Sequence, residues 1–208
     1  MQFLDNDYLL VQNSIMMDLI KFHSRKFKTP FQVQRLLNGL QYNSASTLAS
    51  ANSCLHRKSA HCLEGVFVTA AILEHHNYEP LVLSLESQDG LDHCLFVFQH
   101  KSRWGSVGKS RDKGLNGRAP VFRSLRDLAW SYFDPYVDHS GKLTAWQVAH
   151  LDEVGVDWRY SRTNVWKLEK HLLEIPHHPV KFSKKRYQKL LHHYHRGFDP
   201  VPQPYWWE

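Results

Sequence analysis

The stretch SAHCLEGVFVTAAILEHH, Ser59 to His76, is the most informative part of the sequence for the fold. From Leu63 to Leu73 it is apolar at nearly every position, and a helix that is apolar on most sides lies at the centre of a protein. Ser59 is the expected N-cap. The thiol of Cys62 then falls in the first helical turn, where the positive end of the helix favours a thiolate. The alternative is a cysteine that only packs in the core.

Strand periodicity replaces helical periodicity after Pro80. Apolar runs over 80–87, 92–99 and 103–109 follow one another closely, and HKSR between the last two is typical of a hairpin turn. Strands joined by such short turns pair antiparallel. The sequence therefore predicts an α+β fold in which the central helix packs on an antiparallel β-sheet.

Further helices are expected on both sides of this core. They are predicted over residues 6–23, from Thr29-Pro30, from Ser124, from Thr163 or Asn164, and in the basic segment near the C-terminus. We expect a single domain over 1–208, with a core at about 30–138 and a helical and basic extension over 139–208. Trp158 and Trp166 are expected in the core.

The composition excludes several classes of protein. Of the 208 residues, 42% are hydrophobic and 13% aromatic, which is typical of a globular chain. The sequence has neither an apolar run of about 20 residues nor the pattern of a signal peptide, and its three cysteines lack disulfide spacing. These features predict a cytoplasmic protein without membrane contact. Fifteen histidines form no zinc signature, so neither a metal nor another cofactor is expected.

The positive charge is moderate and unevenly distributed. The net charge of +6 is concentrated in KFSKKRYQKLLHHYHR, residues 181–196. A run of this kind is typical of a solvated helix face, so we do not expect a nucleic-acid partner.

Cys62 has a candidate base in His93. A cysteine nucleophile needs a general base within hydrogen-bond reach, and His93 opens the strand predicted to lie beneath the helix. If His93 faces the helix, strand alternation turns Cys94 to the other side, as a structural thiol. Cys54 lies in a polar segment and is expected to titrate as an ordinary thiol.

The segment over about 55–112 resembles the core of the transglutaminase-like superfamily, a branch of the papain-like cysteine enzymes. The resemblance lies in the order of three segments, SAHCLEGVFVTAAILEHH, LDHCLFVF and RWGSVGKS. A later segment, GRAPVFRSLRDLAWSYFDPYVD, resembles a stretch found in uncharacterised bacterial members of the superfamily. By this resemblance the nucleophile falls on Cys62 and the base on His93.

The third residue of that family, an aspartate on the next strand, is replaced by Gly108 in this sequence. A turn within HKSR brings Ser110 nearly opposite His93, so Ser110 is the expected orienting residue. Asp112, Ser106 and a backbone carbonyl are the alternatives.

The resemblance implies a cysteine acyltransferase or amide hydrolase that works through a thioester, with a peptide, a protein or a small amide or amine as substrate. The alternative is a catalytically impaired relative that binds a peptide or protein in the same cleft.

Overall fold

The computed structural model describes residues 18–112 and 114–197. The helix expected over 6–23 lies mostly outside the described residues, and α2 (Leu19–Lys26) covers its last part and continues beyond it. Pro30 begins α3 (Pro30–Gly39), with Thr29 as its N-cap, as predicted. The other helices are α4 (Ala51–Arg57), α5 (Cys62–Leu73), α6 (Leu125–Trp130), α7 (Phe133–Tyr136), α8 (Trp166–Glu174) and α9 (Lys184–His195), with 3₁₀ turns η1 (Glu74–His76) and η2 (Leu151–Val154).

The main sheet is antiparallel throughout and has the strand order β6-β5-β4-β3-β7-β8. Its strands are β3 (Leu81–Ser87), β4 (His93–His100), β5 (Arg103–Val107), β6 (Arg118–Phe122), β7 (Leu143–His150) and β8 (His178–Pro179). The three strands predicted from the sequence are therefore confirmed. The hairpin between β4 and β5 turns at Lys101 and Ser102, which both have positive φ, as a tight two-residue turn requires.

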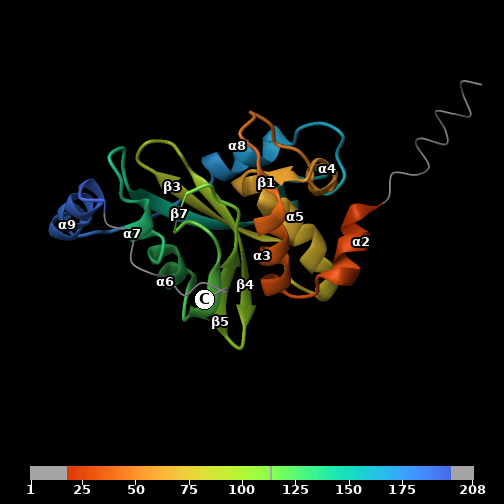
Figure 1. Ribbon diagram of the computed structural model, residues 1–208, viewed down its shortest axis with the longest axis horizontal. Coiled ribbons are helices and arrows are strands. Elements are labelled where there is room, and N and C mark those ends of the chain that lie inside the picture. Colours follow the sequence, from red (N-terminus) through yellow and green to blue (C-terminus); the bar gives the residue numbers. More distant parts are fainter. Residues whose placement is uncertain (1–17, 113, 198–208) are drawn as a thin grey trace, which may run out of the picture.

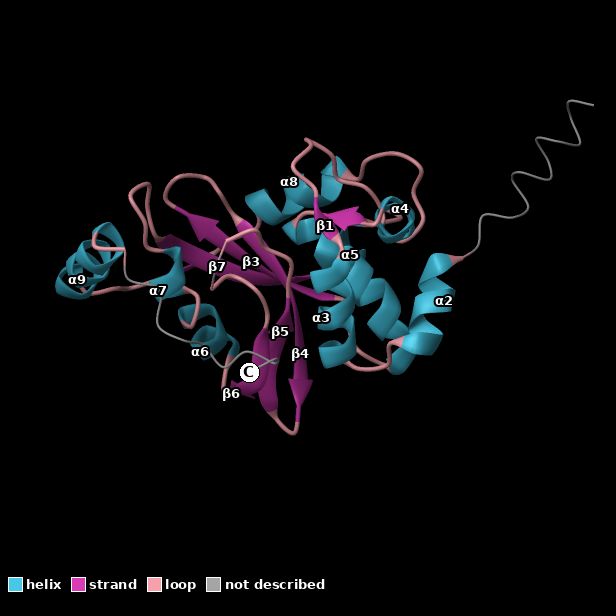
Figure 2. Ribbon diagram, in the orientation of Figure 1, coloured by secondary structure: helices cyan, strands magenta, loops and turns pink. Residues whose placement is uncertain are grey.

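Helices cover both faces of this sheet (Figures 1 and 2). On one face α5 lies at the centre, with α2, α3 and α4 beside it, and their apolar side chains share one core with Val82, Phe96 and Phe98 of the sheet. On the other face α6 and α7 pack on Leu83, Leu95 and neighbouring side chains. The prediction of a central helix packed on an antiparallel sheet is confirmed.

The region after residue 138 differs from the prediction. It was expected to hold only helices and a basic extension, but β7 pairs with β3 along seven residue pairs and so belongs to the middle of the sheet. The N-cap of α8 is Val165, one or two residues later than predicted. Trp158 is buried against Phe67 of α5, as expected.

None of the helices within residues 18–112 and 114–197 combines the length and the apolar character needed to span a bilayer.

Candidate functional site

Cys62 is the first residue of α5 and is partly exposed, whereas Cys54 and Cys94 are buried. The predicted N-cap was wrong by two residues: His61 takes this position, because Ser59 and Ala60 form the short strand β2. β2 pairs in parallel with β1 (Gln41–Tyr42) and fixes the chain just before the helix. The Cys62 thiol therefore lies at the positive end of a buried helix.

The two faces of β4 are the reverse of those predicted. Cys94 shares the core of α5 with Phe96 and Phe98, while Leu95 and Val97 belong to the core on the other side of the sheet. By alternation His93 points the same way as Leu95. Because His93 is the first residue of β4, its ring still reaches Cys62 at the end of the sheet.

Three side chains hydrogen-bond to the sulfur of Cys62. The thiol of Cys94, and then the imidazoles of His61 and His93, hold the pKa of Cys62 well below its ordinary value, although burial acts in the opposite direction. The same contact with Cys62, together with burial, raises the pKa of Cys94 well above its ordinary value. Cys94 is therefore the donor in this pair and Cys62 carries the thiolate.

A backbone carbonyl fixes the ring of His93. Its Nε2 lies 2.7 Å from the carbonyl oxygen of Leu115, and the side chain is only 4% exposed. A carbonyl only accepts hydrogen bonds, so Nε2 carries the proton and Nδ1 is left for Cys62. This is one of the alternatives considered for the third residue.

The side chains expected to orient His93 contact other groups instead. They are those of Ser110, Asp112 and Ser106. Ser110 Oγ accepts a hydrogen bond from the backbone N–H of Asp112 at 3.0 Å. The carboxylate of Asp112 lies 3.6 Å from Nε of Arg111, and Ser106 Oγ contacts the hydroxyl of Tyr132 at 2.7 Å. The β4–β5 ladder ends at the pair Phe96–Val107, before the register would bring Ser110 opposite His93.

Buried polar groups hold the segment after β5 in place. The side-chain amide of Gln34, which is fully buried, donates to the carbonyl of Gly108 at 2.8 Å and accepts from its N–H at 3.0 Å. The guanidinium of Arg118, also buried, donates to the carbonyls of Asn116 and Gly114 at 2.7 and 2.5 Å. These bonds flank Leu115 on both sides, so its carbonyl is fixed where His93 meets it.

The other imidazole, that of His61, was not given a role in the sequence analysis. Its Nε2 lies 2.8 Å from the carbonyl oxygen of Thr47, and its backbone N–H donates to Glu64 Oε2 at 3.1 Å. Burial lowers the pKa of His61, but hydrogen bonding to Cys62 and the nearby negative charges outweigh this, and the pKa is raised. The only signal in the sequence is that His61 immediately precedes the thiol.

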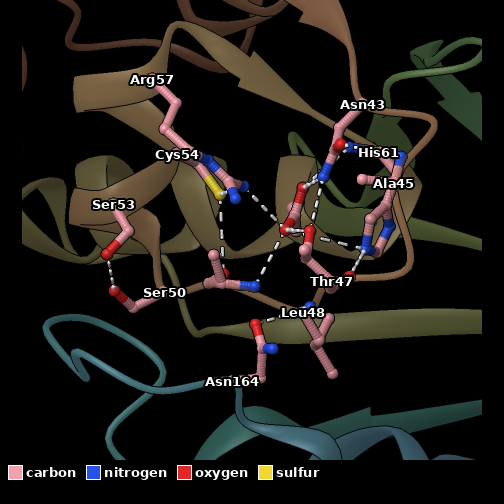
Figure 3. A network of polar contacts seen from close by, with 12 residues as sticks. Asn43, Ala45, Thr47, Leu48, Ser50, Ser53, Cys54, Arg57, His61 and Asn164 are labelled. Carbon is pink, nitrogen blue, oxygen red and sulfur yellow. Dashed lines mark hydrogen bonds and ion pairs between the residues drawn. The ribbon is translucent and has the colours of Figure 1, made fainter.

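A buried carboxylate supports this end of the helix. Glu64 is fully buried and receives hydrogen bonds from Arg57 at 3.0 Å, Asn43 at 2.8 Å and the backbone N–H of Ala49 at 2.8 Å. Figure 3 shows Arg57, Asn43, Thr47 and His61 converging on this point. Burial alone raises the pKa of Glu64, but these bonds hold it below its ordinary value. Glu64, the acid in the first turn of α5, is thus the centre of a polar network.

Cys54 differs from the prediction of an ordinary thiol. It lies in α4 and is completely buried, and burial together with the charge of Glu64 raises its pKa to about 12. Cys54 is therefore protonated and shielded at neutral pH.

An open pocket of about 280 Å³ lies beside His61. Its wall includes Thr47 and the ring of Tyr42, Arg111 from the segment after β5, and Trp166 and Glu169 from α8. Trp166 is 41% exposed, so the prediction that it belongs to the core was wrong. His61 is thus the group of the site that faces this pocket, and Cys62 and His93 are not part of its wall.

Within the part of the chain that the structure describes, no group of three or more His, Cys, Asp or Glu side chains is placed to hold a metal ion.

No family model matches the sequence, and a search of curated proteins finds no match. Legionella pneumophila LapG is similar in structure, with a TM-score of 0.36 and 10% identity over 60% of this chain and 69% of that chain. EGTA-treated Legionella pneumophila LapG has a TM-score of 0.38 and 9% identity, over 72% of this chain and 82% of that chain. Similarity at this level establishes neither a family nor an activity for this chain.

Proposed function

We propose that this protein is a thiol-dependent enzyme of acyl transfer, with Cys62 as nucleophile and His93 as general acid and base. The observation that carries the proposal is a partly exposed thiol at the first residue of a helix, hydrogen-bonded by two imidazoles. Such surroundings turn a weak nucleophile into a reactive one. We assign it a peptide, a protein or a small amide as acyl donor.

The reaction begins with attack of the Cys62 thiolate on the carbonyl carbon of the donor. A C–S bond forms, and the oxygen takes up negative charge beside the backbone N–H groups at the start of α5, which suit an oxyanion. Collapse of this intermediate breaks the C–N bond, and protonated His93 gives its proton to the leaving amine. The product is a thioester on Cys62, which water or an amine then cleaves.

The carbonyl of Leu115 takes the place of a carboxylate behind His93. It fixes the ring and the tautomer, as an orienting group must, but it brings no full negative charge to stabilise imidazolium. We therefore expect turnover to be slower than with an aspartate in this place.

Alkylation by iodoacetamide at pH 6, read by mass spectrometry of the labelled peptides, tests the proposal. Cys62 should be labelled first, because Cys54 and Cys94 are buried and have raised pKa values. His93→Ala should slow the labelling of Cys62. Equal labelling of Cys54 and Cys62, unaffected by His93→Ala, would contradict the proposal and favour a non-catalytic module that binds a peptide in the same cleft.

A further inference from the structure

We propose that His61 is a second catalytic acid–base residue, and that the acyl acceptor, a water molecule or a primary amine, enters through the pocket that His61 lines. This inference rests on the proposed acyl transfer at Cys62. It divides the two halves of the reaction between two histidines: His93 serves the leaving amine, and His61 serves the acceptor.

The first argument is the position and tautomer of His61. His61 is the N-cap of α5 and directly precedes Cys62, and hydrogen bonding between its imidazole and the Cys62 thiol is one of the causes that lower the pKa of Cys62. Its Nε2 must carry a proton, because its partner at 2.8 Å is the Thr47 carbonyl oxygen, which only accepts. A neutral His61 therefore offers the lone pair of Nδ1 on the side of Cys62.

The second argument is access. The side chain of His93 is 4% exposed and is enclosed by the segment that carries Leu115. His61 is less buried and forms part of the wall of the open pocket of about 280 Å³, together with Thr47. An acceptor that enters this pocket meets His61 before it reaches the acyl group on Cys62. The polar lining of Asn43, Ser44, Ser46 and Thr47 suits water or an amine better than an apolar group.

The third argument is the change of charge during the reaction. The charged and titratable groups near His61 are Cys62 and Glu64 of α5, Arg57 of α4, Tyr42 of β1, Arg111, and Glu169 of α8. Among the influences that raise the pKa of His61, the hydrogen bond to Cys62 and its charge come first. Acylation converts the thiolate into a neutral thioester and removes both. Burial then acts against fewer opposing influences, so the pKa of His61 falls and its proton is released more readily to water when a base is needed.

In the second half of the reaction the acyl group passes from Cys62 to the acceptor. The acceptor oxygen or nitrogen attacks the thioester carbonyl and forms a new C–O or C–N bond, while Nδ1 of neutral His61 takes its proton. The C–S bond then breaks, and Cys62 leaves as thiolate beside the newly formed imidazolium. Cys62 and His61 are then back in their starting states. His93 regains through solvent the proton that it gave to the leaving amine, and this equals the proton that His61 released to water on acylation.

Burst kinetics with p-nitrophenyl acetate test the inference, because p-nitrophenolate leaves without a proton and acylation does not need His61. We expect His61→Asn to keep a burst of one equivalent that depends on Cys62, and to lower steady-state turnover by about 10²-fold. Asparagine is a good N-cap, so the helix should be retained, which circular dichroism checks. Hydroxylamine, a stronger nucleophile than water, should restore much of the turnover.

The matched control is His75→Asn at the exposed far end of the same helical segment, which should behave as wild type. Unchanged turnover in His61→Asn would overturn the inference, as would loss of the burst, which would mean that His61 serves acylation instead. If the wild-type protein shows no burst that Cys62→Ala abolishes, the proposed function itself fails. The two failures are therefore distinguishable.

Discussion

The thiol of Cys94, on the strand beneath α5, donates a hydrogen bond to the sulfur of Cys62, the first residue of that helix. The donor comes from the face of β4 that packs against α5, and its pKa is raised while that of Cys62 is lowered. A second cysteine thus stabilises the thiolate of the first.

Cys94→Ala should therefore slow alkylation of Cys62. A hydrogen bond to a charged group contributes about 1.5 kcal/mol, so the pH at which labelling of Cys62 is half-maximal should rise by about one unit. Iodoacetamide labelling followed by mass spectrometry measures this. Cys54→Ala removes another buried thiol that is not among the hydrogen-bond partners of Cys62, and should leave the rate unchanged. An equal effect of both variants would assign the change to packing.

Glu64→Gln should destabilise the protein by about 2 kcal/mol, because it removes a fully buried carboxylate that pairs with Arg57 and accepts hydrogen bonds from Asn43 and the backbone of Ala49. The folded-state pKa of Glu64 lies below its ordinary value of 4.5. Its contribution to stability is therefore fully present above about pH 4.5 and is lost as the pH falls through the folded-state value. Urea unfolding between pH 3 and 7 should show a shallower decline in the variant.

The control for this experiment is Glu86→Gln, an exposed position on β3. It should change the unfolding free energy by less than about 0.5 kcal/mol. A Glu64→Gln curve that runs parallel to that of the wild type below pH 4.5 would show that Glu64 does not cause the acid sensitivity.

Gly117→Ala should lower the reactivity of Cys62 although it lies outside the site. A Cβ at this position would overlap the carbonyl oxygen of Ser106 and Oε1 of Gln34, so the segment that carries Leu115 must move. His93 then loses its fixed orientation, and labelling of Cys62 at pH 6 should slow several-fold. Gly39→Ala, where a Cβ would meet nothing within 4 Å, is the matched control. Labelling at the wild-type rate in Gly117→Ala would show that the Leu115 carbonyl does not matter.

Trp166→Ala should separate binding from reactivity. Its exposed ring lines the pocket beside His61 but is not among the hydrogen-bond partners of Cys62. With a peptide substrate we expect KM to rise several-fold, while labelling by the small reagent iodoacetamide stays as in the wild type. Phe22→Ala, a similarly exposed aromatic on α2, provides the comparison. If Trp166→Ala slowed the labelling of Cys62 by as large a factor as it raised KM, the role of Trp166 would be to hold the site together.

Much of the fold could be predicted because its signals are local. The apolar run after Cys62 produces α5, the caps Thr29 and Ser124 begin α3 and α6, and the turn at Lys101 and Ser102 produces the hairpin. Each depends on residues that are close in sequence, and periodicity and capping report on such neighbours. β7 was missed because it pairs with β3 through residues that are 56 to 69 positions apart in the sequence.

The sequence by itself determined that Cys62 begins a buried helix and that His93 begins a strand of the sheet packed against it. Only the tertiary structure decided which face of β4 meets that helix, because alternation gives the period of a strand but not its phase. It also decided that a backbone carbonyl, that of Leu115, orients His93. All residues carry the same backbone carbonyl, whatever their side chain. Which carbonyl meets His93 therefore depends on how the chain folds around the site and not on the residue type.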